Sequence, residues 1–128
     1  MEPKYHICIL EEDPYIAGLY ARKFTERGWK VTVAEREEEA RNCLEKHVDL
    51  LILDIEGETY EALPLIRELR RANSIWATLP VVVMTNVSDR EKITEAMRLE
   101  ISAYLMKGHF VPKEVVEKVQ RILDASVV

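Results

Sequence analysis

The sequence lacks the features that mark membrane-spanning, secreted and nucleic-acid-binding chains. No apolar stretch approaches the ~18 residues that a membrane span needs, and the opening MEPK contains no apolar core of a signal peptide. The formal net charge of −5 argues against a general basic face for nucleic acid. We therefore expect a cytoplasmic protein with no membrane partner and no direct nucleic-acid partner.

Glycine, cysteine and histidine are also scarce, and their spacing argues against several kinds of site. The chain has 4 glycines, 2 cysteines and 3 histidines. The acidic loop after the first apolar run has neither a glycine fingerprint nor a Lys–Ser/Thr pair, which argues against a bound dinucleotide or nucleotide, and its carboxylates would repel a flavin phosphate. Cys8 and Cys43 show no metal or redox spacing, so we expect two reduced thiols. None of the histidines, His6 included, has a partner at metal-ligand spacing.

What the sequence does contain is a regular alternation of strand-like and helix-like segments. Its 128 residues, 48% hydrophobic and 32% charged, fit one soluble domain, 1–128, with a core of about residues 5–123. Apolar or alternating runs predict strands at Tyr5–Leu10, Lys30–Ala34, Asp49–Leu53, Val81–Thr85 and Ser102–Met106. Helical spacing and capping signals predict helices at Pro14–Arg27, Glu37–Lys46, around Leu63–Leu69, after a capping box at Ser88–Glu91, and from Pro112. This (βα)5 pattern predicts an α/β fold with a parallel sheet covered on both faces.

Four of the five predicted strands end in a chemically useful group. The first is followed by Glu11–Glu12–Asp13, the third by Asp54, the fourth ends at Thr85, and the fifth leads to Lys107. Because the carboxyl ends of parallel strands meet at one edge of the sheet, we expect these groups to gather there. Three acids beside Asp54 suit a hard divalent cation such as Mg²⁺ and a phosphoryl group, although the acids could instead cap the helix that begins at Pro14.

Taken together, these stretches resemble the receiver domain of two-component response regulators, of the chemotaxis-regulator type. The resemblance rests on four segments in the family's order and spacing: Ile9–Pro14 (ILEEDP), Leu51–Ile55 (LILDI), Val82–Thr85 (VVMT) and Ala103–Lys107 (AYLMK). It covers nearly the whole chain, roughly residues 5–123. It implies a flavodoxin-like three-layer sandwich whose five-stranded parallel sheet has the order 2-1-3-4-5.

The resemblance also implies a role for each residue of the site. Asp54 would be the phosphoacceptor, taking a phosphoryl group from a sensor histidine kinase or a histidine phosphotransfer protein. Thr85 and Lys107 would hold the phosphoryl oxygens, and Tyr104 would be the aromatic side chain that changes rotamer. The implied cofactor is Mg²⁺, held by Glu11, Glu12, Asp54 and the backbone carbonyl of Glu56. The chain would then carry out phosphorylation and dephosphorylation of Asp54 only, and is not expected to be an enzyme in any other sense.

Phosphorylation of Asp54 is expected to switch a protein-interaction face. Charge-assisted hydrogen bonds of roughly 1.5–3 kcal/mol each are enough to shift a two-state loop by one to two orders of magnitude. We expect output toward an unidentified downstream protein through the fourth helix, fifth strand and fifth helix, around Arg98, Tyr104 and Val111. The expected state is a monomer or a weak phosphorylation-dependent dimer. With no output domain after Val128, the chain is expected to be free-standing or excised from a longer protein.

Several positions depart from the family pattern. Glu12 replaces the second Asp of the acidic pair, the loop after Asp54 departs from the usual proline and glycine pattern, Asn86 follows Thr85 where a small residue is usual, and Gly108 replaces a proline. These departures leave open a degenerate receiver that acts as a phosphate-independent interaction domain. A phosphohydrolase of the haloacid dehalogenase type is disfavoured, because there the acidic pair follows the lysine and a substrate-capping insertion is needed.

Overall fold

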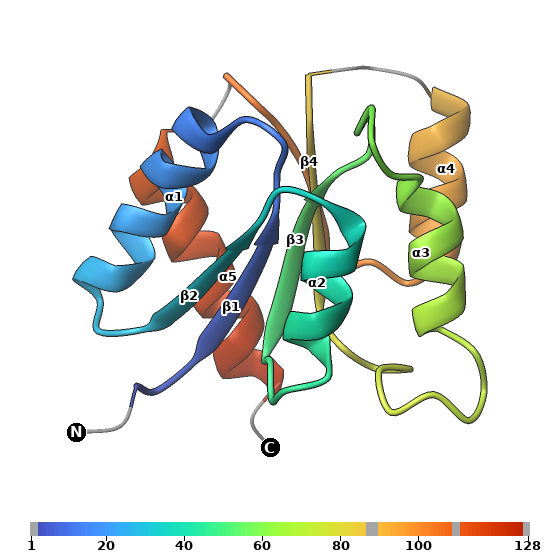
Figure 1. Cartoon of the computed structure of the whole chain (residues 1–128), viewed down its shortest axis with the longest axis horizontal. Helices are drawn as coiled ribbons and strands as arrows, with labels where there is room; N and C mark the ends of the chain where they lie inside the picture. The colour runs from blue at the N-terminus through green and yellow to red at the C-terminus, as the bar shows by residue number, and fades with distance from the viewer. Residues whose placement is uncertain (1–2, 87–89, 109–110, 127–128) are drawn as a thin grey trace.

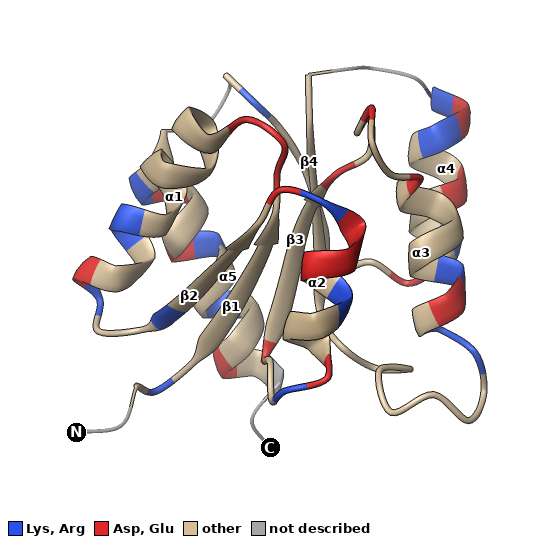
Figure 2. Cartoon of the chain, in the orientation of Figure 1, with Lys and Arg blue, Asp and Glu red and all other residues tan. Residues whose placement is uncertain are grey.

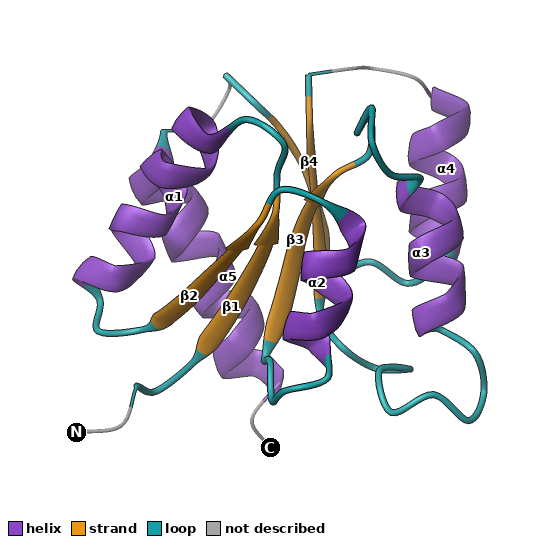
Figure 3. Ribbon diagram, in the orientation of Figure 1, coloured by secondary structure: helices purple, strands orange, loops and turns teal. Residues whose placement is uncertain are grey.

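The computed structural model describes residues 3–86, 90–108 and 111–126, in which strand and helix alternate along the chain (Figure 3). The strands are β1 His6–Leu10, β2 Lys30–Ala34, β3 Leu50–Asp54, β4 Val81–Thr85 and β5 Ala103–Met106. The helices are α1 Pro14–Glu26, α2 Glu37–Leu44, α3 Ala62–Leu69, α4 Arg90–Arg98 and α5 Pro112–Ser126. These elements confirm the predicted alternation. The predicted capping residue Ser88 lies outside the described residues.

The five strands form one parallel sheet in the order β2-β1-β3-β4-β5, as the resemblance implied. The register at the carboxyl edge places Asp54 of β3 opposite Met84 of β4, and Thr85 of β4 opposite Met106 of β5. Since Lys107 directly follows Met106, its backbone N–H donates to the Thr85 carbonyl oxygen at 2.8 Å. The predicted convergence of chemically useful groups at one edge is therefore confirmed at the level of the backbone.

Helices cover both faces of the sheet, which gives the three predicted layers (Figure 1). Alternate strand residues point to opposite faces, so the apolar strands supply two separate hydrophobic clusters. One cluster joins the sheet to α1 and α5 and includes Ile7, Phe24 and Val119. The other joins it to α2, α3 and α4 and includes Cys8, Ile66 and Ala96. Burial on both faces holds the strand ends in fixed positions beneath the site.

Local signals set the ends of the helices that flank the site. The Asp13 side chain accepts hydrogen bonds from the N–H groups of Tyr15 and Ile16, and Pro14 is the first residue of α1. Gly28 follows the end of α1 with a φ of +82°, a conformation that glycine adopts without strain. Within the described ranges, no helix is both long and apolar enough to cross a bilayer.

Candidate functional site

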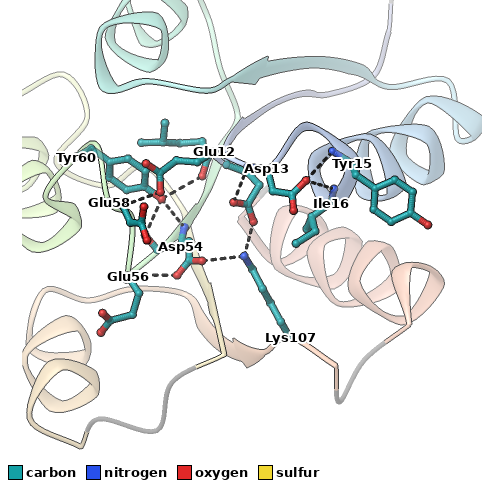
Figure 4. Close-up of polar contacts among 11 residues, drawn as sticks. Glu12, Asp13, Tyr15, Ile16, Asp54, Glu56, Glu58, Tyr60 and Lys107 are labelled. Atoms are coloured by element: carbon teal, nitrogen blue, oxygen red, sulfur yellow. Dashed lines mark hydrogen bonds and ion pairs between the residues drawn. The ribbon is translucent and has the colours of Figure 1, made fainter.

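Three strands deliver the central charged groups of the site. Asp54 is the last residue of β3, Glu11 directly follows β1 and Lys107 directly follows β5. The Lys107 ammonium lies between the two acids: it donates to Asp54 Oδ2 at 2.8 Å (Figure 4) and to Glu11 Oε1. The three side chains are only 9–16% exposed. Residues 43 and 53 positions apart thus form one ion triad, which confirms that they converge.

The triad carries one more negative than positive charge. Burial alone lowers the pKa of Lys107, but its hydrogen bonds to Asp54 and Glu11 outweigh that effect and raise the pKa above its usual value. The lysine therefore stays charged at neutral pH. Figure 2 shows acidic segments after β1 and after β3 at this edge, so the surroundings add further negative charge.

Asp54 also forms hydrogen bonds with the loop that follows it. Its Oδ1 accepts the backbone N–H of Glu56 at 2.8 Å. The buried Tyr60 hydroxyl lies behind it, accepting the backbone N–H of Asp54 at 3.2 Å and donating to the Asp54 carbonyl oxygen at 2.8 Å. Burial and the nearby Asp54 charge raise the pKa of Tyr60, so its hydroxyl keeps its proton. The Asp54 carboxylate is accordingly fixed by Lys107 on one oxygen and by a backbone amide on the other.

Tyr60 shapes the loop that follows Asp54 as well as anchoring it. A methyl group added at Gly57 would lie 2.3 Å from the tyrosine ring, so the backbone passes directly over that ring. Only glycine allows this close approach. Tyr60 was not singled out from the sequence, although a lone aromatic residue inside a polar loop was the available signal.

Glu12 binds the loop after β3. One of its carboxylate oxygens accepts the backbone N–H of Glu58 (Figure 4) and the other that of Thr59, each at 2.6 Å. Burial raises the pKa of Glu12, but a hydrogen bond from the Thr59 side chain, the two backbone amides and the Lys107 charge outweigh it, so the pKa is lowered. The three consecutive acids therefore have three different positions: Glu11 binds Lys107, Glu12 clamps the loop, and Asp13 caps α1. The alternative that the acids cap the helix holds for Asp13.

Thr85 and Tyr104 lie on neighbouring strands beside the triad. Thr85 is fully buried at the end of β4, one position beyond the residue opposite Asp54. Tyr104 is half-buried on β5 and packs against the hydrophobic cluster under α2, α3 and α4. Its hydroxyl donates to the Met106 sulfur at 3.0 Å. Burial raises the pKa of Tyr104.

A link from the site to α4 was not foreseen from the sequence. The Lys92 ammonium on α4 lies 2.7 Å from Glu56 Oε1. Because the Glu56 N–H donates to Asp54, one residue joins the central carboxylate to α4. Gly108, after Lys107, has a φ of +84°. Proline cannot adopt this φ, so the backbone here differs from that of a receiver with the usual proline at this position.

The carboxylates of the site suit a hard divalent cation. Among the described residues, no group of three or more His, Cys, Asp and Glu side chains is arranged to hold a metal ion. Mg²⁺, however, is commonly bound by only one or two carboxylates and keeps several waters. Glu11 and Asp54 supply two carboxylates that already converge on one cationic group, Lys107. The pair therefore fits such an ion without Glu12.

Comparison with known proteins decides the family. The family model of the response regulator receiver domain matches residues 7–120. The chain belongs to this family. A receiver domain is a signalling domain rather than an enzyme in the ordinary sense, and its family interacts with histidine kinases. The haloacid dehalogenase alternative is thereby set aside.

Individual relatives of this receiver domain agree with the assignment. It is 24% identical over 118 residues to the response regulator SaeR of Staphylococcus aureus, covering 92% of this chain and 50% of that protein. The chain thus spans about half the length of the curated relatives it matches. A CheY-like receiver domain from Methanospirillum hungatei has a TM-score of 0.84 at 20% identity, covering 94% of each chain. A response regulator from Chloroflexus aurantiacus, described as putative, has a TM-score of 0.82 at 25% identity, covering 96% and 99%.

Proposed function

We propose that this receiver domain accepts a phosphoryl group on Asp54 from the phosphohistidine of a sensor kinase or a histidine phosphotransfer protein. The observation that carries the proposal is the setting of Asp54, whose carboxylate is held between the Lys107 ammonium and the Glu56 amide at the open edge of the sheet. Receiver domains generally use Mg²⁺, and a cytoplasmic location fits a partner of this kind.

The chain's own residues suit nucleophilic attack on phosphorus. An oxygen of Asp54 forms the new P–O bond while the bond from phosphorus to the histidine nitrogen, or to a small acyl donor, breaks. The fixed position of the carboxylate lowers the entropic part of the barrier. Lys107 lies at hydrogen-bond distance from Asp54 and can follow the phosphoryl oxygens, and the Thr85 hydroxyl at the adjacent strand end can donate to one of them.

Glu11, Asp54 and the carbonyl of Glu56 would hold Mg²⁺, which neutralises phosphoryl charge when it is bound. The prediction that Glu12 is a further ligand stays a prediction. Each Glu12 oxygen already accepts one loop amide, so a bond to the ion would either use its second lone pair or replace that amide.

The contacts of Glu56 support output through α4, β5 and α5. A phosphoryl group on Asp54 competes for the Glu56 amide and the Lys107 ammonium, and so disturbs the Glu56–Lys92 pair and the start of the β5–α5 connection. Thr85 moving toward the phosphoryl group would leave room for Tyr104 to turn inward. The exposed surface around Arg98, Tyr104 and Val111 would then change for a downstream protein.

The test is phosphorylation by acetyl phosphate with and without Mg²⁺, measured by intact mass. The mass should rise by one phosphoryl group only when Mg²⁺ is present, and Asp54→Asn should abolish the gain. Asp13→Asn is the matched control, because asparagine caps a helix as well as aspartate and the residue lies on the same edge. Equal labelling of the Asp54→Asn variant would refute the proposal.

One observation favours a second candidate, a phosphate-independent interaction domain. Glu12, which replaces the second Asp of the family's acidic pair, binds the loop amides of Glu58 and Thr59. Absence of labelling at high donor and Mg²⁺ concentration, with the fold intact by circular dichroism, would establish that candidate instead.

A further inference from the structure

A second cluster of reactive side chains lies away from the phosphoacceptor site, between β1 and α2. Cys8 is fully buried on β1, and Cys43 is 5% exposed on α2. Both belong to the same hydrophobic cluster, and an interaction between the two thiols shifts the pKa of each. Both are free thiols in the structure. Sequence spacing could not reveal this pair, because its two residues come from different elements.

His6 places a base beside Cys43. Its Nδ1 lies 2.8 Å from the carbonyl oxygen of His47, and because a carbonyl only accepts, Nδ1 must carry the proton. In the neutral ring Nε2 is then the acceptor. It accepts a hydrogen bond from the Thr32 hydroxyl at 2.8 Å, and it lies 3.9 Å from the Cys43 sulfur. A thiol, a histidine nitrogen and a carbonyl that orients the ring together form the arrangement that activates cysteine nucleophiles.

The surroundings separate the roles of the two thiols. The hydrogen bond from Cys8 lowers the pKa of Cys43, with help from the positive charge of Lys46, and outweighs burial. The same sulfur contact, together with burial, raises the pKa of Cys8. Cys43, unlike Cys8, also lies beside a histidine nitrogen, so geometry and the direction of the pKa shift both favour Cys43 as the nucleophile.

An open hollow lies next to this cluster. His6 lines an open hollow of about 450 Å³ at the amino edge of the sheet, together with Lys46, His47 and Lys30. Cys43 keeps a small exposed fraction and lies at hydrogen-bond distance from the same histidine. Hydrogen peroxide is close to water in size, so a small opening beside His6 is enough for it.

We propose that Cys43 is a peroxide-reactive cysteine, activated by His6 and resolved by Cys8 into a disulfide that joins α2 to β1. Cys43 first gives its proton to Nε2 of His6, and its thiolate then attacks one peroxide oxygen: an S–O bond forms, the O–O bond breaks, and the other oxygen leaves as hydroxide, which takes that proton back from Nε2. Cys8 sulfur then attacks Cys43 sulfur, the S–O bond breaks, and the hydroxyl leaves with the Cys8 proton as water. Overall, two thiols and one peroxide give one disulfide and two waters. This site does not depend on phosphorylation of Asp54.

The test treats the reduced full chain with hydrogen peroxide, then denatures it and alkylates free thiols. The expected result is a monomer that takes up no alkylating agent after peroxide, takes up two labels without peroxide, and regains both after reduction. Cys8→Ser should still oxidise, yielding a Cys43 sulfenic acid that dimedone captures. Cys43→Ser should leave Cys8 reduced. Two alkylatable thiols after peroxide, a disulfide between molecules, or oxidation of Cys8 in the Cys43→Ser variant would each overturn the proposal.

The positioning role of His6 is tested separately by the pH dependence of Cys43 alkylation in a Cys8→Ser background. His6→Gln should slow alkylation at neutral pH by roughly tenfold or more and shift the midpoint of the pH profile upward. His47→Gln is the matched control, since only the backbone carbonyl of His47 orients the ring. Thr32→Val provides a second variant should His6→Gln fail to fold, and it should shift the midpoint in the same direction. Unchanged profiles in the folded variants would remove His6 from the proposal.

Discussion

Replacing Lys107 with glutamine should destabilise the fold and at the same time strengthen Mg²⁺ binding. Each charge-assisted hydrogen bond contributes roughly 1.5–3 kcal/mol, and breaking a buried ion pair by removing one partner costs about 3–5 kcal/mol. The side chains of Glu11 and Asp54 keep 10% and 16% exposure, so water relieves part of their repulsion. We therefore expect the free energy of unfolding to fall by about 3 kcal/mol without a divalent cation, the lower end of that range.

Mg²⁺ should restore much of that loss. In the native protein the ion must share Glu11 and Asp54 with the ammonium, whereas in the variant both carboxylates are released. In the variant the ion no longer has to displace a hydrogen bond of the Lys107 ammonium. If that displacement costs about 1.4 kcal/mol, the affinity for Mg²⁺ rises about tenfold. At a Mg²⁺ concentration 100 times the dissociation constant, the folded state gains about 2.7 kcal/mol, since the ion binds only that state.

Urea unfolding followed by tryptophan fluorescence measures both effects. Trp29 is buried and stacks on Phe24 at 5.7 Å between ring centroids, so its emission reports loss of the core. Titrations at constant ionic strength separate Mg²⁺ binding from charge screening. Lys113→Gln, at an exposed position on α5, removes the same charge away from the site. A Lys107→Gln variant as stable as Lys113→Gln, or one that Mg²⁺ stabilises no more than the native chain, would refute the reasoning.

Two further variants test the groups that hold the loop after β3. Glu12→Gln should cost about 1–3 kcal/mol near neutral pH, because each clamp bond has a charged acceptor. The folded-state pKa of Glu12 is lowered, so this contribution is present above its ordinary value of about 4.5 and is lost as the pH falls through the lowered pKa; native and variant stabilities should converge in acid. Tyr60→Phe should cost about 1–3 kcal/mol, because the Asp54 backbone loses its hydroxyl partner, and should slow labelling of Asp54 by acetyl phosphate. Equal chemical denaturation midpoints for native and variant chains would contradict either prediction.

The fold was accessible from the sequence because local signals and the hydrophobic pattern agree. Apolar runs of five residues give strands buried on both faces, and helical periodicity gives the covering helices, so pattern alone specifies a (βα)5 chain. Strand order is different. It came from resemblance to a family, because periodicity does not state which strands pair. The ends of α2 and α3 were also less certain, since neither helix has a side-chain cap of the kind that Asp13 gives α1.

The site was accessible only as far as the strand ends determine it. Glu11, Asp54 and Lys107 follow or end buried strands, so sheet geometry alone brings them together. Glu12 shows the limit of that reasoning. Its backbone lies at the same edge, but two free loop amides, rather than the neighbouring acids, determine where its carboxylate points. The backbone conformation of a loop is hard to predict from sequence. The position of a side chain that binds the loop is therefore equally hard to predict.

The β1 strand shows how one short segment can support two separate chemistries. Its alternation points His6 and Cys8 toward α2, while the carboxyl end delivers Glu11 to the phosphoacceptor site. The apolar pattern of β1 identifies Cys8 only as a buried residue. Its neighbour Cys43 can be identified only when the position of α2 on the sheet is known. The two chemistries are separable by experiment, because Asp54→Asn leaves the cysteine cluster intact and Cys43→Ser leaves the ion triad intact. A change in phosphorylation after oxidation of the native chain, absent in Cys43→Ser, would therefore have to pass through β1 or the helices packed on it.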